Sequence, residues 1–348
     1  MIERWSRERV GAWYDAQPWM LGFNYLPRTA VNWTELWQAE SFDLATIEQE
    51  LDWARRIGFN ALRTNLQYLV WQHDPAGTVT RLDRFLGAAA RRGMRTMLCL
   101  FDDCAFSGRE PYLGPQDPPL PGLHNSGGAA SPGRAVVRDR AAWPALERYV
   151  KDLVGSFRDD ARLIAFDLYN EPGNEMVFTR TPEPHPDGPL APHSVELAEH
   201  AFRWAREAGA TQPLTTGVWD RGMEAALARR LLDASDFVSF HDYLPLANVA
   251  EQVAALRAEG RPIVCTEWLA RGLRSLPETH LPFFARERVG AFHWGLVNGR
   301  TQTHRPWPGL APFIPDDGVW HHDLLHADGT AYDEREIALF RSLRPPRA

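Results

Sequence analysis

The feature that most constrains the fold of this chain is the alternation of short apolar runs with amphipathic segments along its whole length. Each apolar run has the length and composition of a buried strand, and a segment of helical period follows it. Strands joined by helical crossovers pair in parallel. The predicted strands span residues 20–26, 60–67, 95–102, 163–170, 213–219, 237–243, 262–268 and 289–296.

The best-defined helix is predicted over residues 45–58, where Asp43 is placed to cap the first turn and Gly58 to end the last one. The same apolar stripe predicts helices at 81–93, 143–157, 194–209, 247–260 and 333–343, with weaker patterns at 221–232 and 277–286.

Two architectures satisfy this order: a closed eight-stranded barrel and an open doubly wound sheet. The open sheet usually carries a glycine-rich phosphate loop after its first strand, whereas residues 24–33 (NYLPRTAVNW) contain no GxGxxG. The long loops 105–142, 177–193 and 299–332 all follow strands, on the side where barrels build active sites. We therefore predict an α/β fold, a single (β/α)8 TIM barrel with long βα loops after strands 3, 4 and 8. Residues 1–348 form one domain, with residues 1–19 as an N-terminal extension packed on the barrel.

Charge and composition exclude several classes of function. The formal net charge is −7 with a pI near 6.0, so a nucleic-acid partner is not expected. No run of apolar residues is long enough to span a membrane, and residues 1–19 lack the apolar core of a signal peptide, which predicts a cytoplasmic protein. The 3 cysteines make neither a disulfide framework nor a zinc motif.

Two predicted strands end on a carboxylate. The run FDLYNEP stops at Asn170 and Glu171 because Pro172 removes a ladder donor and forces an extended backbone before it. The run PIVCTEW ends at Glu267, which shares its parity with Cys265. Strands 4 and 7 lie roughly opposite in an eight-stranded barrel, so the two acids can face each other across its mouth. Such a pair is what cleavage of a glycosidic bond requires. Asn170 and Glu171 can both face the mouth only if the backbone bulges or twists there.

Other polar and aromatic residues lie at corresponding levels of neighbouring strands. Arg63 is in the second strand (NALRTN), and His241 and Tyr243 end the sixth (FVSFHDY). Trp294 is in the eighth strand (GAFHWGL). Each residue alone is weak evidence, but together they predict one polar site at the barrel mouth.

This set of residues resembles the glycoside hydrolases of clan A, and family 5 in particular, from strand 2 to strand 8. The resemblance implies that Glu171 is the acid/base, that Asn170 binds the sugar 2-hydroxyl, and that Glu267 is the nucleophile. Arg63 and Tyr243 would then hold the nucleophile.

The same resemblance places His241 near the acid/base and Trp294 under the sugar ring. One departure is found at strand 3, where family 5 commonly has a histidine and this chain reads LCLFDDCAF. Asp102 or Asp103 takes that place, and its parity with Phe101 predicts that Asp103 points inward.

A retaining double displacement follows from these roles, with carboxyl groups about 5–5.5 Å apart. Glu267 must be ionised to attack, and Glu171 must carry a proton to donate. Burial is expected to raise the pKa of Glu171, and Arg63 to keep the pKa of Glu267 low. No cofactor or metal is required. His321, His322 and His326 lack the spacing of a metal motif.

Tryptophan suits the face of a sugar ring. About half of those at strand ends and in loops are expected to contact substrate, Trp219 and Trp268 among the candidates, and His304 could touch substrate from the last long loop. The candidates are Trp33, Trp37, Trp71, Trp219, Trp268, Trp294, Trp307 and Trp320.

Long loops around the mouth favour a pocket over an open groove, and hence exo action on oligosaccharides or small β-glycosides. The alternatives are an endo-acting β-glycanase of cellulase, mannanase or xylanase type and an inactive carbohydrate-binding barrel. A metal-dependent barrel hydrolase would typically show HxH after strand 1, and NYLPRT has none. The sugar, the linkage and the oligomeric state stay open.

Overall fold

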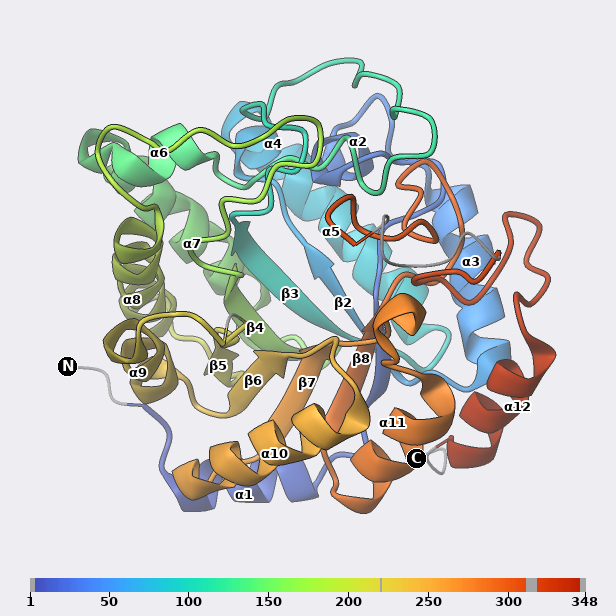
Figure 1. Ribbon diagram of the computed structural model, residues 1–348. Helices are drawn as coiled ribbons and strands as arrows, with labels where there is room; N and C mark the ends of the chain where they lie inside the picture. Colours follow the sequence, from blue (N-terminus) through green and yellow to red (C-terminus); the bar gives the residue numbers. More distant parts are fainter. Residues whose placement is uncertain (1–3, 220, 311–317, 345–348) are drawn as a thin grey trace.

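A computed structural model describes residues 4–219, 221–310 and 318–344, and eight parallel strands form its centre (Figure 1). The sheet order is β5-β4-β3-β2-β1-β8-β7-β6. A parallel bridge between Val218 and Phe240 joins the segment after β5 to β6 and completes the ring. The predicted barrel is therefore confirmed. The strands are β1 (Leu21–Asn24), β2 (Ala61–Asn65), β3 (Arg95–Asp102), β4 (Leu163–Asn170), β5 (Leu214–Thr215), β6 (Val238–His241), β7 (Ile263–Glu267) and β8 (Gly290–Trp294).

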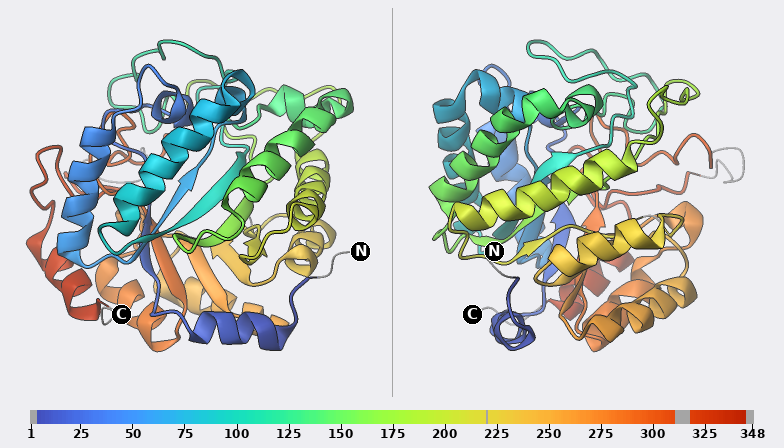
Figure 2. Two further views of the ribbon diagram at one scale, coloured as in Figure 1. Left: turned by 180° about the vertical axis from the view of Figure 1, so that it is seen from behind. Right: turned by 90° about the vertical axis from the view of Figure 1, so that its left-hand side faces the viewer.

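Helices surround the barrel, and each predicted helical segment overlaps one of them (Figures 1 and 2). The side chain of Asp43 accepts from Thr46 N at 3.0 Å, and Gly58 ends the same helix with a φ of 114°, as predicted. The helices are α1 (Arg7–Asp15), α2 (Trp33–Trp37), α3 (Leu44–Ile57), α4 (Tyr68–His73), α5 (Pro75–Ala90), α6 (Arg134–Arg138), α7 (Trp143–Phe157), α8 (Ala191–Glu207), α9 (Ala225–Ala234), α10 (Leu246–Leu256), α11 (Pro277–Arg286) and α12 (Glu334–Leu343).

The N-terminal segment lies across the end of the barrel where the strands begin, with α1 far from the long loops (Figures 1 and 2). Trp5, Val10 and Tyr14 pack there with Met97 and Phe292 from the strand starts. This apolar floor closes one end of the barrel. The other end, where the strands finish, is left to the polar side chains and the long loops.

An irregularity in β7 decides where Glu267 points. Cys265 pairs with Phe240, but Glu267 pairs with the next residue of β6, His241, so β7 carries one extra residue at this step. Cys265 belongs to the core between barrel and helices, whereas Glu267 lines the cavity at the mouth. The parity argument from Cys265 was therefore wrong, and the bulge is what turns Glu267 inward.

The pairing of β3 with β4 stays in register from Met97 to Asp102, but the side on which successive residues of β3 lie changes within this stretch, and the change decides which of two aspartates faces the mouth. Cys99 faces the interior, with its sulfur 3.7 Å from an Arg63 nitrogen, while the ring of Phe101 packs 5.5 Å from Tyr149 on α7. The alternation of sides is interrupted between these two residues. Asp102 consequently faces the mouth and Asp103 the surrounding helices, which reverses the prediction.

The backbone of the turn after β4 explains how the consecutive residues Asn170 and Glu171 can both face the barrel mouth. Glu171 has a φ of 45°, in the left-handed region that a residue other than glycine rarely adopts. This twist lets the two consecutive side chains both line the cavity, as the sequence required. Strained backbone of this kind is often found at functional sites.

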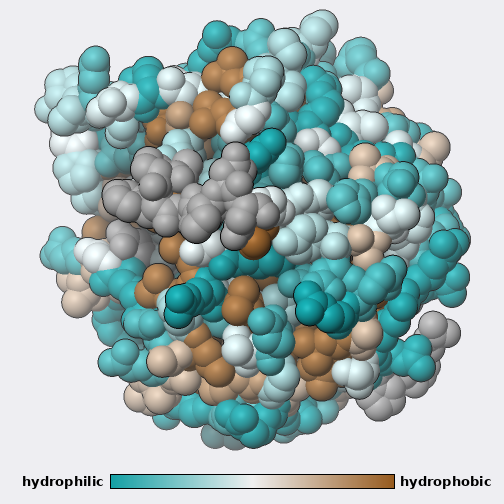
Figure 3. Space-filling model, turned by 45° about the vertical axis from the view of Figure 1, so that its right-hand side comes forward, coloured by the Kyte–Doolittle hydropathy of each residue, from teal (hydrophilic) through white to brown (hydrophobic). Residues whose placement is uncertain are grey.

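Hydrophobic residues on the face shown in Figure 3 form small groups among hydrophilic ones. Within the described residues, no helix has both the length and the apolar character needed to span a bilayer.

Candidate active site

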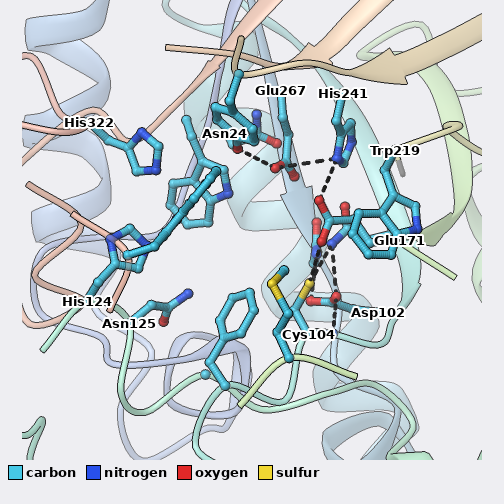
Figure 4. Close-up of a pocket in the computed structure, with 18 of the residues that line it drawn as sticks. Asn24, Asp102, Cys104, His124, Asn125, Glu171, Trp219, His241, Glu267 and His322 are labelled. Atoms are coloured by element: carbon cyan, nitrogen blue, oxygen red, sulfur yellow. Dashed lines mark hydrogen bonds and ion pairs between the residues drawn. The ribbon is translucent and has the colours of Figure 1, made fainter. Parts of the chain in front are cut away.

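A cavity of about 310 Å³ opens at the carboxyl ends of the strands. Figure 4 shows Glu267 and His241 on one side of it, Glu171 and Cys104 next to them, and His124, Asn125 and His322 across from Glu171. Its volume lies within the range of small-molecule sites, about 300–1,000 Å³. The cavity gathers most of the predicted site residues: Arg63, Asn170, Glu171, Trp219, His241, Tyr243, Glu267 and Trp294.

The two acids predicted from distant parts of the sequence meet in this cavity. One oxygen of Glu171, one oxygen of Glu267 and one nitrogen of His241 all lie within 4.8 Å of one another. Both acids are buried. Carboxyl groups about 5–5.5 Å apart suit a retaining displacement, whereas inverting enzymes leave about 6.5–9.5 Å for a water molecule.

Glu267 is held by a cation and a phenol. Arg63 donates from Nη1 to Oε1 of Glu267 at 3.0 Å, and Tyr243 donates its hydroxyl to Oε2 at 2.6 Å. The guanidinium is itself fixed, because it also donates to Asp167 at 2.7 Å and to Oδ1 of Asn170 at 2.7 Å. These bonds join β2, β4 and β7 beneath the cavity.

Glu171 has neutral partners instead. Its Oε1 lies 2.8 Å from Nδ1 of His241. Its Oε2 accepts from the Asn174 amide at 2.6 Å and from the Cys104 thiol at 3.1 Å. Burial lowers the pKa of His241 to about 4, so this ring is neutral near pH 7. The indole of Trp219 donates to the carbonyl of Pro172 at 3.1 Å and so holds an aromatic wall beside the acid.

Burial dominates the ionisation of both carboxyls. Loss of solvent raises the pKa of Glu171 to about 7, as predicted. Burial and the charge of Glu171 also raise the pKa of Glu267 above its ordinary 4.5, although His241, Arg63 and Tyr243 oppose the shift. Arg63 does lower the pKa of Glu267, as expected, but burial outweighs this effect, so the expectation of a low pKa is wrong. Glu267 is still the acid that ionises first, because a guanidinium stabilises its carboxylate.

Three predicted site residues lie outside the cavity. Asp103 accepts from Tyr169 at 2.7 Å and from Ser194 at 2.5 Å, between β4 and α8. Trp268 is fully buried, with its ring stacked 5.8 Å from His280 on α11. His304 packs against Trp320 at 5.4 Å. The first two face the helix layer because strand alternation breaks nearby, and the third belongs to a loop whose path the sequence did not fix.

The tryptophans divide as expected, into those that contact the cavity and those that anchor structure. Trp33, Trp219, Trp294 and Trp307 line the cavity, whereas Trp37, Trp71, Trp268 and Trp320 do not.

Several cavity residues were not among the site residues chosen from the sequence, and one of them, Asp102, was the alternative that lost to Asp103. Asp102 accepts from Trp33 at 2.9 Å, from Asn65 at 3.0 Å and from Asn170 at 2.9 Å, and so links β2, β3 and β4. Asn24 accepts from Arg63 at 2.9 Å. Each of these polar residues ends a strand, a position that could have identified it. Cys104, His124, Asn125 and His322 come from loops and carried no such pattern.

Glu171, His241 and Glu267 also have the spacing of a metal site. Glu267 already accepts hydrogen bonds from Arg63 and Tyr243, and Glu171 is hydrogen-bonded to His241. A guanidinium 3.0 Å from Glu267 supplies the positive charge that a metal would bring. The set therefore fits an acid pair better than a metal centre.

No protein-family model matches the chain, and no curated protein matches it in sequence. Solved structures do match. A variant of GH5_18 from Streptomyces cattleya, in complex with Manβ1-4GlcNAc, has a TM-score of 0.61 at 17% identity, over 94% of this chain and 80% of that one.

An exo-β-1,4-mannosidase from Opitutaceae bacterium strain TAV5 has a TM-score of 0.61 at 17% identity, over 93% of this chain and 59% of that one. The GH5-4 broad specificity endoglucanase from Clostridium acetobutylicum has a TM-score of 0.57 at 15% identity, over 97% and 98%. At these identities the likeness establishes a shared fold.

Proposed function

We propose that this protein is a retaining β-glycoside hydrolase in which Glu267 is the nucleophile and Glu171 the acid/base. The observation that carries the proposal is the separation of the two acids, an oxygen of each lying within 4.8 Å. This spacing suits a covalent intermediate, for which carboxyl groups stand about 5–5.5 Å apart, better than the wider separation of about 6.5–9.5 Å that an inverting water needs. The fold shared with solved glycosidases supports the same class of reaction.

In the first step, the carboxylate of Glu267 attacks the anomeric carbon and forms a glycosyl ester. The bond from that carbon to the glycosidic oxygen breaks, and the leaving oxygen takes the proton of Glu171. The raised pKa of Glu171, about 7, keeps this proton available at neutral pH. Arg63 and Tyr243 hold the nucleophile in place.

In the second step, Glu171 is ionised and acts as a base. It removes a proton from a water molecule, and the resulting oxygen displaces Glu267 from the anomeric carbon. Two inversions at that carbon retain the β configuration. The free acid of Glu171 and the carboxylate of Glu267 are then restored.

The wall of the cavity across from Glu171 favours exo action. His124 and Asn125 come from the loop after β3, and Trp307 from the loop after β8. These loops are joined by hydrogen bonds from Asn125 N to Thr301 O at 2.7 Å and between His124 Nδ1 and Arg305 O at 2.7 Å. These bonds support exo action, because a wall of two joined loops limits the room for a longer sugar chain.

The shared structures suggest which sugars to test first. Two of them are an exo-β-1,4-mannosidase and a protein solved with Manβ1-4GlcNAc, so β-mannosides lead the panel. The endoglucanase is the counter-example, because the same barrel there serves an endo-acting enzyme. Endo action is therefore the second candidate.

The test is a panel of nitrophenyl β-mannoside, β-glucoside, β-xyloside and β-galactoside, with Manβ1-4GlcNAc and a soluble mannan or glucan for comparison. Proton NMR of the first product reports its anomeric configuration. We expect a β product, release of single sugars, and turnover that EDTA does not reduce. An α product would refute the retaining mechanism, and fast cleavage inside the polymer would favour endo action. Binding without turnover would indicate an inactive barrel, and loss of activity in EDTA a metal enzyme.

A further inference from the structure

The loop after β3 places a thiol against the proposed acid/base. Cys104 donates from its sulfur to Oε2 of Glu171 at 3.1 Å (Figure 4). The thiol is fixed from several directions, because the backbone N–H of Cys104 donates to Oδ1 of Asp102 at 2.9 Å. Its sulfur also accepts from the Asn170 amide at 3.4 Å and from the Asn174 amide at 3.5 Å. With two donors pointing at the sulfur, the S–H is left to point at Glu171.

The ionisation state of this thiol defines its role. Burial, together with the charges of Asp102 and Glu171, raises the pKa of Cys104 well above its ordinary 9.0. The group is therefore a thiol at working pH, which makes it a hydrogen-bond donor and not a nucleophile. The acid next to it receives a weak but permanent donor.

The two oxygens of Glu171 differ as a result. Oε2 accepts two hydrogen bonds, from the Asn174 amide at 2.6 Å and from Cys104 at 3.1 Å, and faces the loop. Oε1 faces His241 at 2.8 Å, and that same ring nitrogen lies 3.5 Å from Oε2 of Glu267. An oxygen that already accepts two donors is a poor site for the acid proton, whereas Oε1 faces Nδ1 of a neutral imidazole, which accepts a hydrogen bond in its Nε2–H tautomer.

We infer that Cys104 is a positioning residue for the acid/base: with Asn174 it occupies Oε2 of Glu171, so that Oε1 carries the proton and delivers it to the glycosidic oxygen. This inference rests on the proposed function. In the first step the Oε1–H bond breaks, the proton moves to the glycosidic oxygen, and the leaving bond's electron pair stays on that oxygen. In the second step Oε1 takes a proton from water. Throughout, Oε2 keeps its two donors.

The thiol also adjusts the strength of the acid. A donor to Oε2 stabilises the carboxylate of Glu171 and so lowers its pKa, against the larger effect of burial. A stronger donor at position 104 should lower that pKa further, and an apolar side chain should raise it.

The first test compares Cys104→Ser and Cys104→Ala through the pH dependence of kcat/KM, on a substrate with a poor leaving group. We expect the alkaline limb to move down by about half a pKa unit in the serine variant and up by about half a unit in the alanine variant, the size of one modest hydrogen bond. Cys265→Ser makes the same exchange at a buried thiol that donates to the backbone carbonyl of Glu267 and not to a carboxylate, and should leave the limb in place. Shifts in one common direction, or none, would overturn the inference.

The second test does not require turnover. Alkylation of Cys104 by iodoacetamide, followed by peptide mass spectrometry at a series of pH values, reports its thiol pKa. Glu171→Gln removes a negative charge 3.1 Å from the sulfur, so labelling at pH 8 should rise about threefold or more. The fully buried Cys99 and Cys265 serve as internal references. An unchanged labelling rate would refute the contact, whereas a wild-type protein inactive on every glycoside would refute only the proposed function.

Discussion

Arg63 donates from Nη1 to Oε1 of Glu267 at 3.0 Å, across the mouth of the barrel from β2 to β7. This bond distinguishes the two carboxyls of the site. Glu267 has a permanent cation beside it, while Glu171 has an amide, a thiol and a neutral imidazole. The asymmetry is what allows one acid to be ionised while the other keeps its proton.

The first prediction concerns the nucleophile. Glu267→Gln keeps the shape of the side chain but cannot form the glycosyl ester, so kcat should fall by about 10⁴-fold or more. Circular dichroism and the melting temperature should show an intact fold. If turnover persists near the wild-type rate in a variant free of contaminating wild-type protein, Glu267 is not the nucleophile.

The role of Glu171 as acid/base can be tested by varying the leaving group of the substrate. Glu171→Gln should reduce kcat/KM by about 10²–10⁴-fold for alkyl glycosides, whose leaving oxygen needs a proton, and much less for dinitrophenyl glycosides. Added azide needs no base, so it should restore turnover and give a β-glycosyl azide. The same loss for both leaving groups would contradict the assignment.

The pH profile of the wild-type enzyme follows from the shifts at the two acids. Glu171 must be protonated to act, and burial raises its pKa to about 7, so kcat/KM should fall as the pH rises through about 7. Glu267 must be ionised, and its pKa is raised, so the acid limb should lie above 4.5. A profile that is flat from pH 5 to pH 9 would exclude this pair.

The junction between the loops after β3 and β8 should control the length of substrate that the enzyme prefers. Gln302 joins the two long loops, accepting from Gly122 N at 2.7 Å and donating to Leu120 O at 2.8 Å. Gln302→Asn tolerates the positive φ of 53° but is too short for both bonds. Loss of two hydrogen bonds, about 1.4 kcal/mol, should raise kcat/KM for substrates extended at the non-reducing end by up to about tenfold relative to single-sugar glycosides. An unchanged ratio would show that this junction does not limit chain length.

Burial of Glu171 should also cost stability at alkaline pH. Its pKa is raised from 4.5 to about 7, so between these values the folded state binds more protons than the unfolded state, and the free energy of unfolding falls as the pH rises. Glu171→Gln removes this contribution, at most about 3 kcal/mol for a shift of about 2.5 pKa units. Urea unfolding at pH 5 and pH 8 should therefore show the variant gaining stability relative to wild type at the higher pH. A constant difference would mean that Glu171 ionises as readily folded as unfolded.

Much of the fold follows from periodicity alone. Each predicted strand and helix overlaps an observed one, because local hydrogen bonding and apolar patterning depend on neighbouring residues. The helices α1, α2, α4 and α6 were not predicted, and β5 is shorter than the predicted strand. The two carboxylates could be found for a related reason. Acids that end apolar strands of a parallel barrel must gather at one rim, whatever the details of packing.

The direction of individual side chains could not be read in the same way. Strict alternation along the strand placed Glu267 on the same side as Cys265, but one extra residue in β7 put them on opposite sides. Alternation also predicted that Asp103 faces the mouth, but Asp102 faces it instead because the alternation in β3 is interrupted. Bulges depend on pairing with a neighbouring strand, which the sequence of one strand does not contain.

The sequence by itself determined the barrel and the end of it that carries the long loops. It also determined that Glu171, Glu267, Arg63 and Asn170 lie at that end. Only the tertiary structure decided that Cys104 contacts the acid, that His124 and His322 share a wall, and that burial raises the pKa of Glu267 as well as that of Glu171. The physical reason is the distance along the sequence between the residues that determine each feature. Secondary structure and strand ends are set by contacts within a few residues, whereas loop paths, solvent exclusion and the partners of a buried charge depend on residues that meet only after the chain has folded.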